Sequence, residues 1–179
     1  MTGPPNGQNG WNGPLNGRNG GGDPVHANVR RVSAHAAAQG VPIAVRRFAA
    51  TTRTATDAAA QIGCDVAAIV KSLVFLADGV AVVALCSGAD RIDLDKLRDV
   101  IGAASVRRAT ADEAKAATGF PIGGVAPFAH ATACVVVADR KLIAQPSVWA
   151  AAGLPDAVFE IAPAALVRAS GATVADLAA

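Results

Sequence analysis

The 179-residue sequence is poor in the residue types that most often mark a function. It contains no tyrosine, and aromatic residues make up only 4% of it. Charged residues make up 17%, and the formal net charge is +2. A protein that grips a long nucleic-acid duplex carries a basic stripe, and none is present, which argues against DNA as a partner. Contact with a short nucleic-acid end stays open, because few phosphates then need neutralising.

Metal-binding patterns are also missing. The cysteines form no C-x-x-C pair and have no histidine at zinc-finger spacing, and an odd number of thiols in apolar segments indicates reduced cysteines in a cytoplasmic protein. The acidic residues Asp90, Asp93 and Asp95 lie at the start of a predicted helix, where the helix dipole favours them. We therefore expect no metal and no other cofactor. The three cysteines are Cys64, Cys86 and Cys134.

The motifs of several catalytic classes are absent. The chain has no G-x-x-x-x-G-K-S/T and no G-x-G-x-x-G motif, so sites for ATP and dinucleotides lack support. It also lacks the G-x-S-x-G elbow of many triad hydrolases. The N-terminus has no apolar segment of the secretory kind. The best candidate for a membrane span, residues 72–86, is divided by Asp78-Gly79, so no membrane association is expected.

What is present divides the chain into two parts. Residues 1–22 contain Asn-Gly five times, with Trp11 and Leu15 as their only large apolar residues. Such a segment buries too little apolar surface to offset its ordering entropy, so we predict a flexible tail. Residues 23–179 have enough valine, isoleucine, leucine and phenylalanine for one core and are predicted to form a single domain.

Periodicity and turn residues predict an α+β fold in that domain. Runs of β-branched residues recur as hairpins, without regular βαβ alternation, which indicates a mixed, partly antiparallel β-sheet flanked by helices. Capping residues and glycine stops delimit the helices. The predicted helices are 23–40, 57–62, 93–101, 110–118 and 163–170, with one further helical turn at 65–68. The predicted strands are 43–48, 69–76, 80–86, 105–108, 132–138, 148–152 and 157–161.

The most distinctive stretch is residues 119–130, which hold three glycines, two prolines and a histidine. Gly123 and Gly124 permit positive φ and close approach of another group to the backbone. Pro127 fixes its own φ and pushes Ala126 toward an extended conformation. Two interpretations follow: a stiff turn whose backbone N–H groups face a ligand, or a tight crossover packed on the core.

This stretch, read as Gly-Phe-x-x-Gly-Gly-Val-x-Pro-Phe, resembles the signature loop of the YbaK/prolyl-tRNA-synthetase-associated editing family. Three further stretches resemble that family in the same order and spacing, and together they cover residues 25–177. They are Ile69–Phe75, Ser87-Gly88 followed by Asp93–Leu97, and the tail Pro163–Arg168 with Gly171–Asp176. The resemblance implies one YbaK-like domain.

Lys71 interrupts an apolar strand run, where a charged amine is costly unless it reaches water, an anion or a ligand. It could also sit at the strand start and extend outward. The family places a functional lysine here, followed by threonine, and Ser72 keeps that hydroxyl. His130 either contacts substrate or caps the loop, and Asp139 either lies near the pocket or caps the following turn. Ala129 stands where the family usually has glycine.

The resemblance therefore implies a site and an activity. The expected catalytic residues are Lys71, Gly123 and Gly124. The expected substrate-binding residues are Ser72, Val125, Ala126, Pro127, His130 and Asp139. The family hydrolyses aminoacyl esters on mischarged tRNA, and backbone donors with a substrate hydroxyl or thiol would supply much of the catalysis.

The implied activity is that of a cytoplasmic, free-standing trans-editing deacylase. Its partner would be the acceptor end of an aminoacyl-tRNA, most plausibly tRNA for proline carrying a small wrong amino acid, with prolyl-tRNA synthetase as a further candidate. The alternative is a non-catalytic module of the same fold that binds tRNA or a synthetase. Arg107 and Arg108 either touch tRNA phosphates or occupy an exposed strand face.

Overall fold

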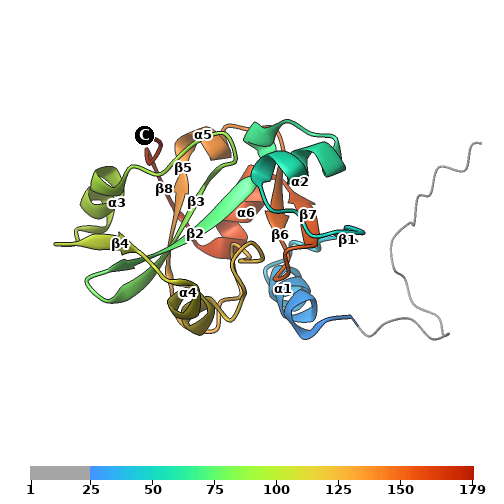
Figure 1. Cartoon of the computed structure of the whole chain (residues 1–179), viewed down its shortest axis with the longest axis horizontal. Helices are drawn as coiled ribbons and strands as arrows, with labels where there is room; N and C mark the ends of the chain where they lie inside the picture. Colours follow the sequence, from blue (N-terminus) through green and yellow to red (C-terminus); the bar gives the residue numbers. More distant parts are fainter. Residues whose placement is uncertain (1–24) are drawn as a thin grey trace, which may run out of the picture.

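The computed structural model describes residues 25–179, so the predicted tail and the first two residues of the predicted helix 23–40 lie outside the described residues. The fold is α+β, as predicted (Figure 1). The helices are α1 (Ala27–Ala38), α2 (Ala55–Ile62), the 3₁₀ turn η1 (Val66–Ala68), α3 (Leu94–Ile101), α4 (Ala111–Thr118), α5 (Arg140–Ile143) and α6 (Pro163–Ser170). The strands are β1 (Val45–Arg47), β2 (Val70–Ala77), β3 (Val80–Ser87), β4 (Val106–Arg108), β5 (Val135–Asp139), β6 (Val148–Ala151), β7 (Ala157–Ile161) and β8 (Thr173–Ala175).

The strands form two sheets. The larger one is mixed, in the order β4-β2-β3-β5-β8, with β3, β5 and β8 parallel and the β2 pairings antiparallel. The smaller one, β1-β7-β6, is antiparallel. A single bridge between Ile69 and Trp149 joins the start of β2 to β6. Figure 1 shows β2 as the long central strand, with α3 and β4 at one end and α2 and β1 at the other.

The turn between β2 and β3 holds β4 in place. Asp78 and Gly79 both have positive φ, 48° and 84°, as expected of the two central residues of a two-residue hairpin of type I′. The Asp78 carboxylate then accepts hydrogen bonds from the backbone N–H groups of Ala104 (2.8 Å) and Ser105 (2.9 Å). These bonds lower the pKa of Asp78. The hairpin thus fixes the segment that leads into β4 at the edge of β2.

Two cores cover the two faces of the larger sheet. The main core joins both sheets, α1, α6 and residues 119–130, called the glycine-rich loop below. Its largest fully buried side chains include Phe120, Phe159 and Leu166. The second core packs α3 and the C-terminal segment against the other face through Leu97 and Leu177. Burial of such side chains contributes about 1.5–3 kcal/mol each relative to exposure.

Most predicted elements are present, with shifted boundaries. Helix α2 starts two residues earlier than predicted, because its capping box is formed by Thr54 and Asp57. His26 caps α1 through a bond from the Asn28 N–H to its Nδ1. Strand β8 was not predicted, since three residues after a helix stop carry little periodic signal. No helix among residues 25–179 is long and apolar enough to cross a membrane.

Candidate functional site

A cavity of about 330 Å³ lies where the two sheets meet. Its walls come from the segment before α2, the first half of β2, the end of β4, the glycine-rich loop and β6. Strand β4 pairs only with residues 75–77 of β2, so the earlier part of that edge faces the cavity. Because strand hydrogen bonds alternate between edges, and Val74 O accepts from Ala109 N on the β4 side, the backbone of Ser72 points to this free edge.

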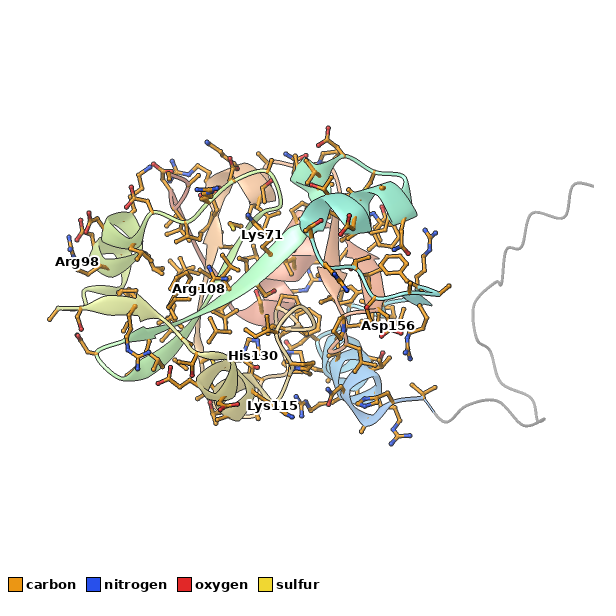
Figure 2. The ribbon with its side chains drawn as sticks, in the orientation of Figure 1. Lys71, Arg98, Arg108, Lys115, His130 and Asp156 are labelled. Carbon is orange, nitrogen blue, oxygen red and sulfur yellow. The ribbon has the colours of Figure 1, made fainter. Side chains whose placement is uncertain are left out.

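Lys71 is half-buried in the cavity wall, near the start of β2 (Figure 2). Its Nζ donates a hydrogen bond to the backbone carbonyl of Asp90. The Asp90 carboxylate lies 3.9 Å from Lys141 Nζ. Lys71 therefore has no carboxylate partner among residues 25–179, and its charge is available to an anion in the cavity.

Ser72 lines the cavity beside Lys71. Its Oγ is buried and has no hydrogen-bond partner within the described part of the chain. A buried unsatisfied hydroxyl costs about 1–3 kcal/mol, so its presence calls for a physical reason. A polar group of a bound ligand would provide one.

The cavity lining contains only one kind of ionisable group. Its charged residues are the cations Arg53, Lys71 and Arg108, and the lining residues include no aspartate, glutamate, histidine or cysteine. The Cys86 thiol lies on β3, where Cys86 pairs with Lys71, and the residue is fully buried. Burial raises its pKa to about 11, although Lys71 and Arg108 act in the opposite direction. A neutral, inaccessible thiol is not a nucleophile.

The glycine-rich loop combines both interpretations of its sequence. Gly124 donates its N–H to Pro121 O (2.9 Å) across a turn in which Gly123 has φ +84°. Gly124 is buried against Leu154, and its N–H is already used. The expectation that the Gly124 N–H faces a ligand therefore does not fit this geometry. Gly123 and Val125 line the cavity, and within residues 25–179 neither donates its N–H to a backbone or side-chain acceptor.

Ala126 and Pro127 are buried and are not among the residues of the cavity wall. Ala126 instead accepts a hydrogen bond from His130 Nε2 (2.8 Å) through its carbonyl oxygen. The His130 ring packs edge-on against Phe120, and burial lowers its pKa. His130 thus caps the loop, which is one of its two expected roles. Ala129, which lies between Ala126 and His130 in the sequence, has φ +62°.

Asp139 is also not among the residues of the cavity wall. It is fully buried. Its Oδ1 accepts from the N–H groups of Leu177 (2.7 Å) and Ala178 (2.9 Å), and its Oδ2 accepts from Lys141 N–H (2.8 Å). These bonds cap α5 and hold the C-terminal segment. The capping interpretation fits this geometry, whereas a pocket position does not.

Several cavity residues were not singled out by sequence reasoning. Ile122 lines the mouth and is 55% exposed, which is high for a large apolar residue. Thr52 also lines the cavity, and its hydroxyl donates to Pro155 O (3.3 Å). Trp149 lies in the wall formed by β6. Only the rarity of tryptophan in this sequence gave a signal for any of them, because their places depend on contacts between distant segments.

The described residues thus form an α+β domain with a cavity where its two sheets meet, and comparison with known proteins assigns the chain to a family. The aminoacyl-tRNA editing domain family matches residues 49–169, more than half of the chain, and the chain belongs to this family. One solved structure, a candidate trans-editing enzyme for prolyl-tRNA synthetase, has 40% sequence identity and a TM-score of 0.81, covering 87% of this chain and 99% of that one. A hypothetical protein has 33% identity and a TM-score of 0.78, covering 83% and 99%.

Curated relatives are much longer proteins. The proline–tRNA ligase of Acidithiobacillus ferrooxidans is 32% identical over 104 residues, which is 58% of this chain and 18% of the ligase. The proline–tRNA ligase of Streptococcus pyogenes is 36% identical over 90 residues, 50% of this chain and 15% of the ligase. The chain thus spans less than a fifth of these ligases, and the similarity is confined to one segment of each.

Proposed function

We propose that this protein is a free-standing aminoacyl-tRNA deacylase that removes wrong amino acids from tRNA in trans. One observation carries the proposal: the cavity lining of this editing-family domain contains both an ammonium group that has no carboxylate partner among residues 25–179, Lys71, and a hydroxyl that has no hydrogen-bond partner there, Ser72. Such a pair suits a ligand that has both an anionic and a hydrogen-bonding group. The 3′ end of an aminoacyl-tRNA has both, as phosphate and as ribose or amino acid.

The cavity favours hydrolysis without a protein nucleophile. Ser72 has no histidine or carboxylate beside it in the lining, so nothing there activates its hydroxyl. Aminoacyl esters are labile, and water or a substrate hydroxyl or thiol can attack the carbonyl carbon. The developing oxyanion then needs donors, and the N–H groups of Gly123, Val125 and the free β2 edge are the candidates. Lys71 would hold the phosphate or ribose side.

The favoured substrate is tRNA for proline carrying a small wrong amino acid. Sequence similarity to proline–tRNA ligases supports this tRNA. The alanine residues in the wall, at positions 55, 58, 109, 150 and 151, leave an apolar space, but one methyl group changes binding by only about 1–3 kcal/mol. Prolyl-tRNA synthetase is the proposed protein partner. An enzyme acting on charged tRNA works where translation occurs, so the proposed location is the cytoplasm.

The test is release of amino acid from a panel of tRNAs charged with Ala, Cys, Ser, Thr and Pro. We expect release from at least one mischarged tRNA for proline and little release of proline itself. Binding of these tRNAs without any release would overturn the deacylase proposal in favour of a non-catalytic binding module.

A further inference from the structure

Two adjacent arginines on β4 occupy different environments. Arg107 donates to both carboxylate oxygens of Glu113, at 2.9 and 2.7 Å. Arg108 forms no ion pair within residues 25–179 and lines the cavity instead. Successive strand residues point to opposite faces, which accounts for the difference. Glu113 therefore neutralises Arg107, whereas β4 presents Arg108 to the cavity with no ion-pair partner among residues 25–179.

Arg108 shares its sheet face with Lys71. Arg108 pairs with Phe75 and Lys71 pairs with Cys86, and Lys71 and Phe75 are four residues apart on β2, which puts them on one face. Strand geometry separates the Cα atoms of Lys71 and Arg108 by about 14 Å. Figure 2 shows both labelled residues along the central strand.

Arg53 supplies a third charge, from the segment that leads into α2. It lines the cavity and forms no ion pair among the described residues. Its neighbours are both fixed: Thr52 bonds to Pro155 O, and Thr54 caps α2. Arg53 is therefore presented by a constrained turn, and the positive charges belong to three different segments of the cavity wall.

We propose that Arg108 and Arg53 form a phosphate clamp for a single-stranded RNA end whose last nucleotide enters the cavity beside Lys71. This inference rests on the proposed function and assigns the contacts that lie beyond the reacting ester. A single strand suits this site, because its successive phosphates can each bind a separate cation. Each phosphate that a cation neutralises adds about 0.7 to the slope with which log affinity falls as log salt concentration rises. The low net charge of the chain leaves these local cations to supply the attraction.

The experiment uses the full chain with Trp11→Phe, so that Trp149 in the cavity wall reports binding by fluorescence. The probe is a short, unstructured RNA that ends in CCA and carries no amino acid, titrated over a range of KCl concentrations. Arg108→Gln should weaken binding about 1.5- to 5-fold at 0.1 M salt, as expected for an exposed ion pair. It should also reduce the log–log salt slope by about 0.7, and Arg53→Gln should do the same. Arg108→Lys should restore the slope.

Arg107→Gln is the matched control, because it removes the same charge from the neighbouring position of the same strand. It should leave the salt slope at the wild-type value. Equal slopes for Arg107→Gln and Arg108→Gln, or no salt-dependent binding of the RNA, would overturn the clamp. A DNA probe of the same sequence that binds equally well would show that phosphates alone are recognised and would overturn the RNA assignment.

The tRNA panel separates this inference from the proposed function. Deacylation by the wild type together with wild-type behaviour of Arg108→Gln would contradict the clamp and leave the deacylase standing. Loss of slope in Arg108→Gln without deacylation of any tRNA by the wild type would support the clamp and contradict the deacylase. Thermal unfolding of each variant confirms that it is folded.

Discussion

The backbone of Leu154 lies directly against Gly124. A Cβ atom on Gly124 would come 2.8 Å from both the Cα and the carbonyl carbon of Leu154, a separation that real Cβ atoms do not adopt. The hairpin between β6 and β7 is thus packed on the glycine-rich loop, and this contact sets one wall of the cavity. Gly124 is required here for space, whereas Gly123, with φ +84°, is required for conformation.

The first prediction follows from this contact. Gly124→Ala should destabilise the protein by about 1–3 kcal/mol, because the backbone of Leu154 must move to admit the methyl group. Gly123→Ala meets nothing closer than 3.8 Å and should cost about 1–2 kcal/mol through backbone strain alone. Urea unfolding measures both. A Gly124→Ala protein as stable as the wild type would contradict the packing argument.

Ala129 provides the second prediction. Its φ of +62° lies in the left-handed region, which costs an alanine about 1–2 kcal/mol relative to a right-handed conformation. Ala129→Gly removes that strain. Glycine also loses more conformational entropy on folding than alanine does, which lowers stability by about 0.5–1 kcal/mol. The net result should be stabilisation by about 0.5–1 kcal/mol, seen as a higher urea midpoint with an unchanged slope. A lower midpoint would show that the methyl group makes compensating contacts.

The third prediction concerns Asp139. Asp139→Ala removes the acceptor of three backbone N–H groups, two of them in the buried C-terminal segment. Each bond to a charged acceptor is worth about 1.5–3 kcal/mol, so the free energy of unfolding should fall by at least about 3 kcal/mol. The specific activity of the fraction that remains folded should stay at the wild-type value. An Asp139→Ala protein that keeps its stability but loses activity would contradict this prediction and indicate that Asp139 contacts substrate.

His130 gives a pH dependence. Burial lowers its pKa in the folded protein, so the unfolded chain binds a proton at this position more strongly. The contribution of His130 to stability should be fully present above about pH 6.5, its pKa in the unfolded chain. It should be lost as the pH falls through the lower pKa of the folded protein. His130→Gln should remove this part of the decline. The check is urea unfolding between pH 5 and pH 8, and an equal decline in both proteins would contradict the assignment.

Particular residues show what the sequence could and could not predict. The α+β class and the β2–β3 hairpin were predictable, because local periodicity and turn chemistry determine them, whereas the expected site position of Lys71 came from the family resemblance. The separation of the strands into two sheets was not predicted, because it depends on pairings between distant segments such as β1 and β7. The loop residues Ala126 and Pro127 look like site residues in sequence but are buried. The different roles of Gly123 and Gly124 were not predictable either, because the need for Gly124 comes from the backbone of Leu154, which is distant in the sequence.

The central claim is that the cavity around Lys71 carries out deacylation, and Lys71→Ala tests it most directly. The amine's only hydrogen bond within the described chain is to a backbone carbonyl, so its removal should change the free energy of unfolding by less than about 1 kcal/mol. Loss of a buried charge contact to substrate should slow single-turnover deacylation of mischarged tRNA at least about 30-fold. Both quantities should be measured on one preparation. A variant that loses stability but keeps the wild-type deacylation rate per folded molecule would contradict the account.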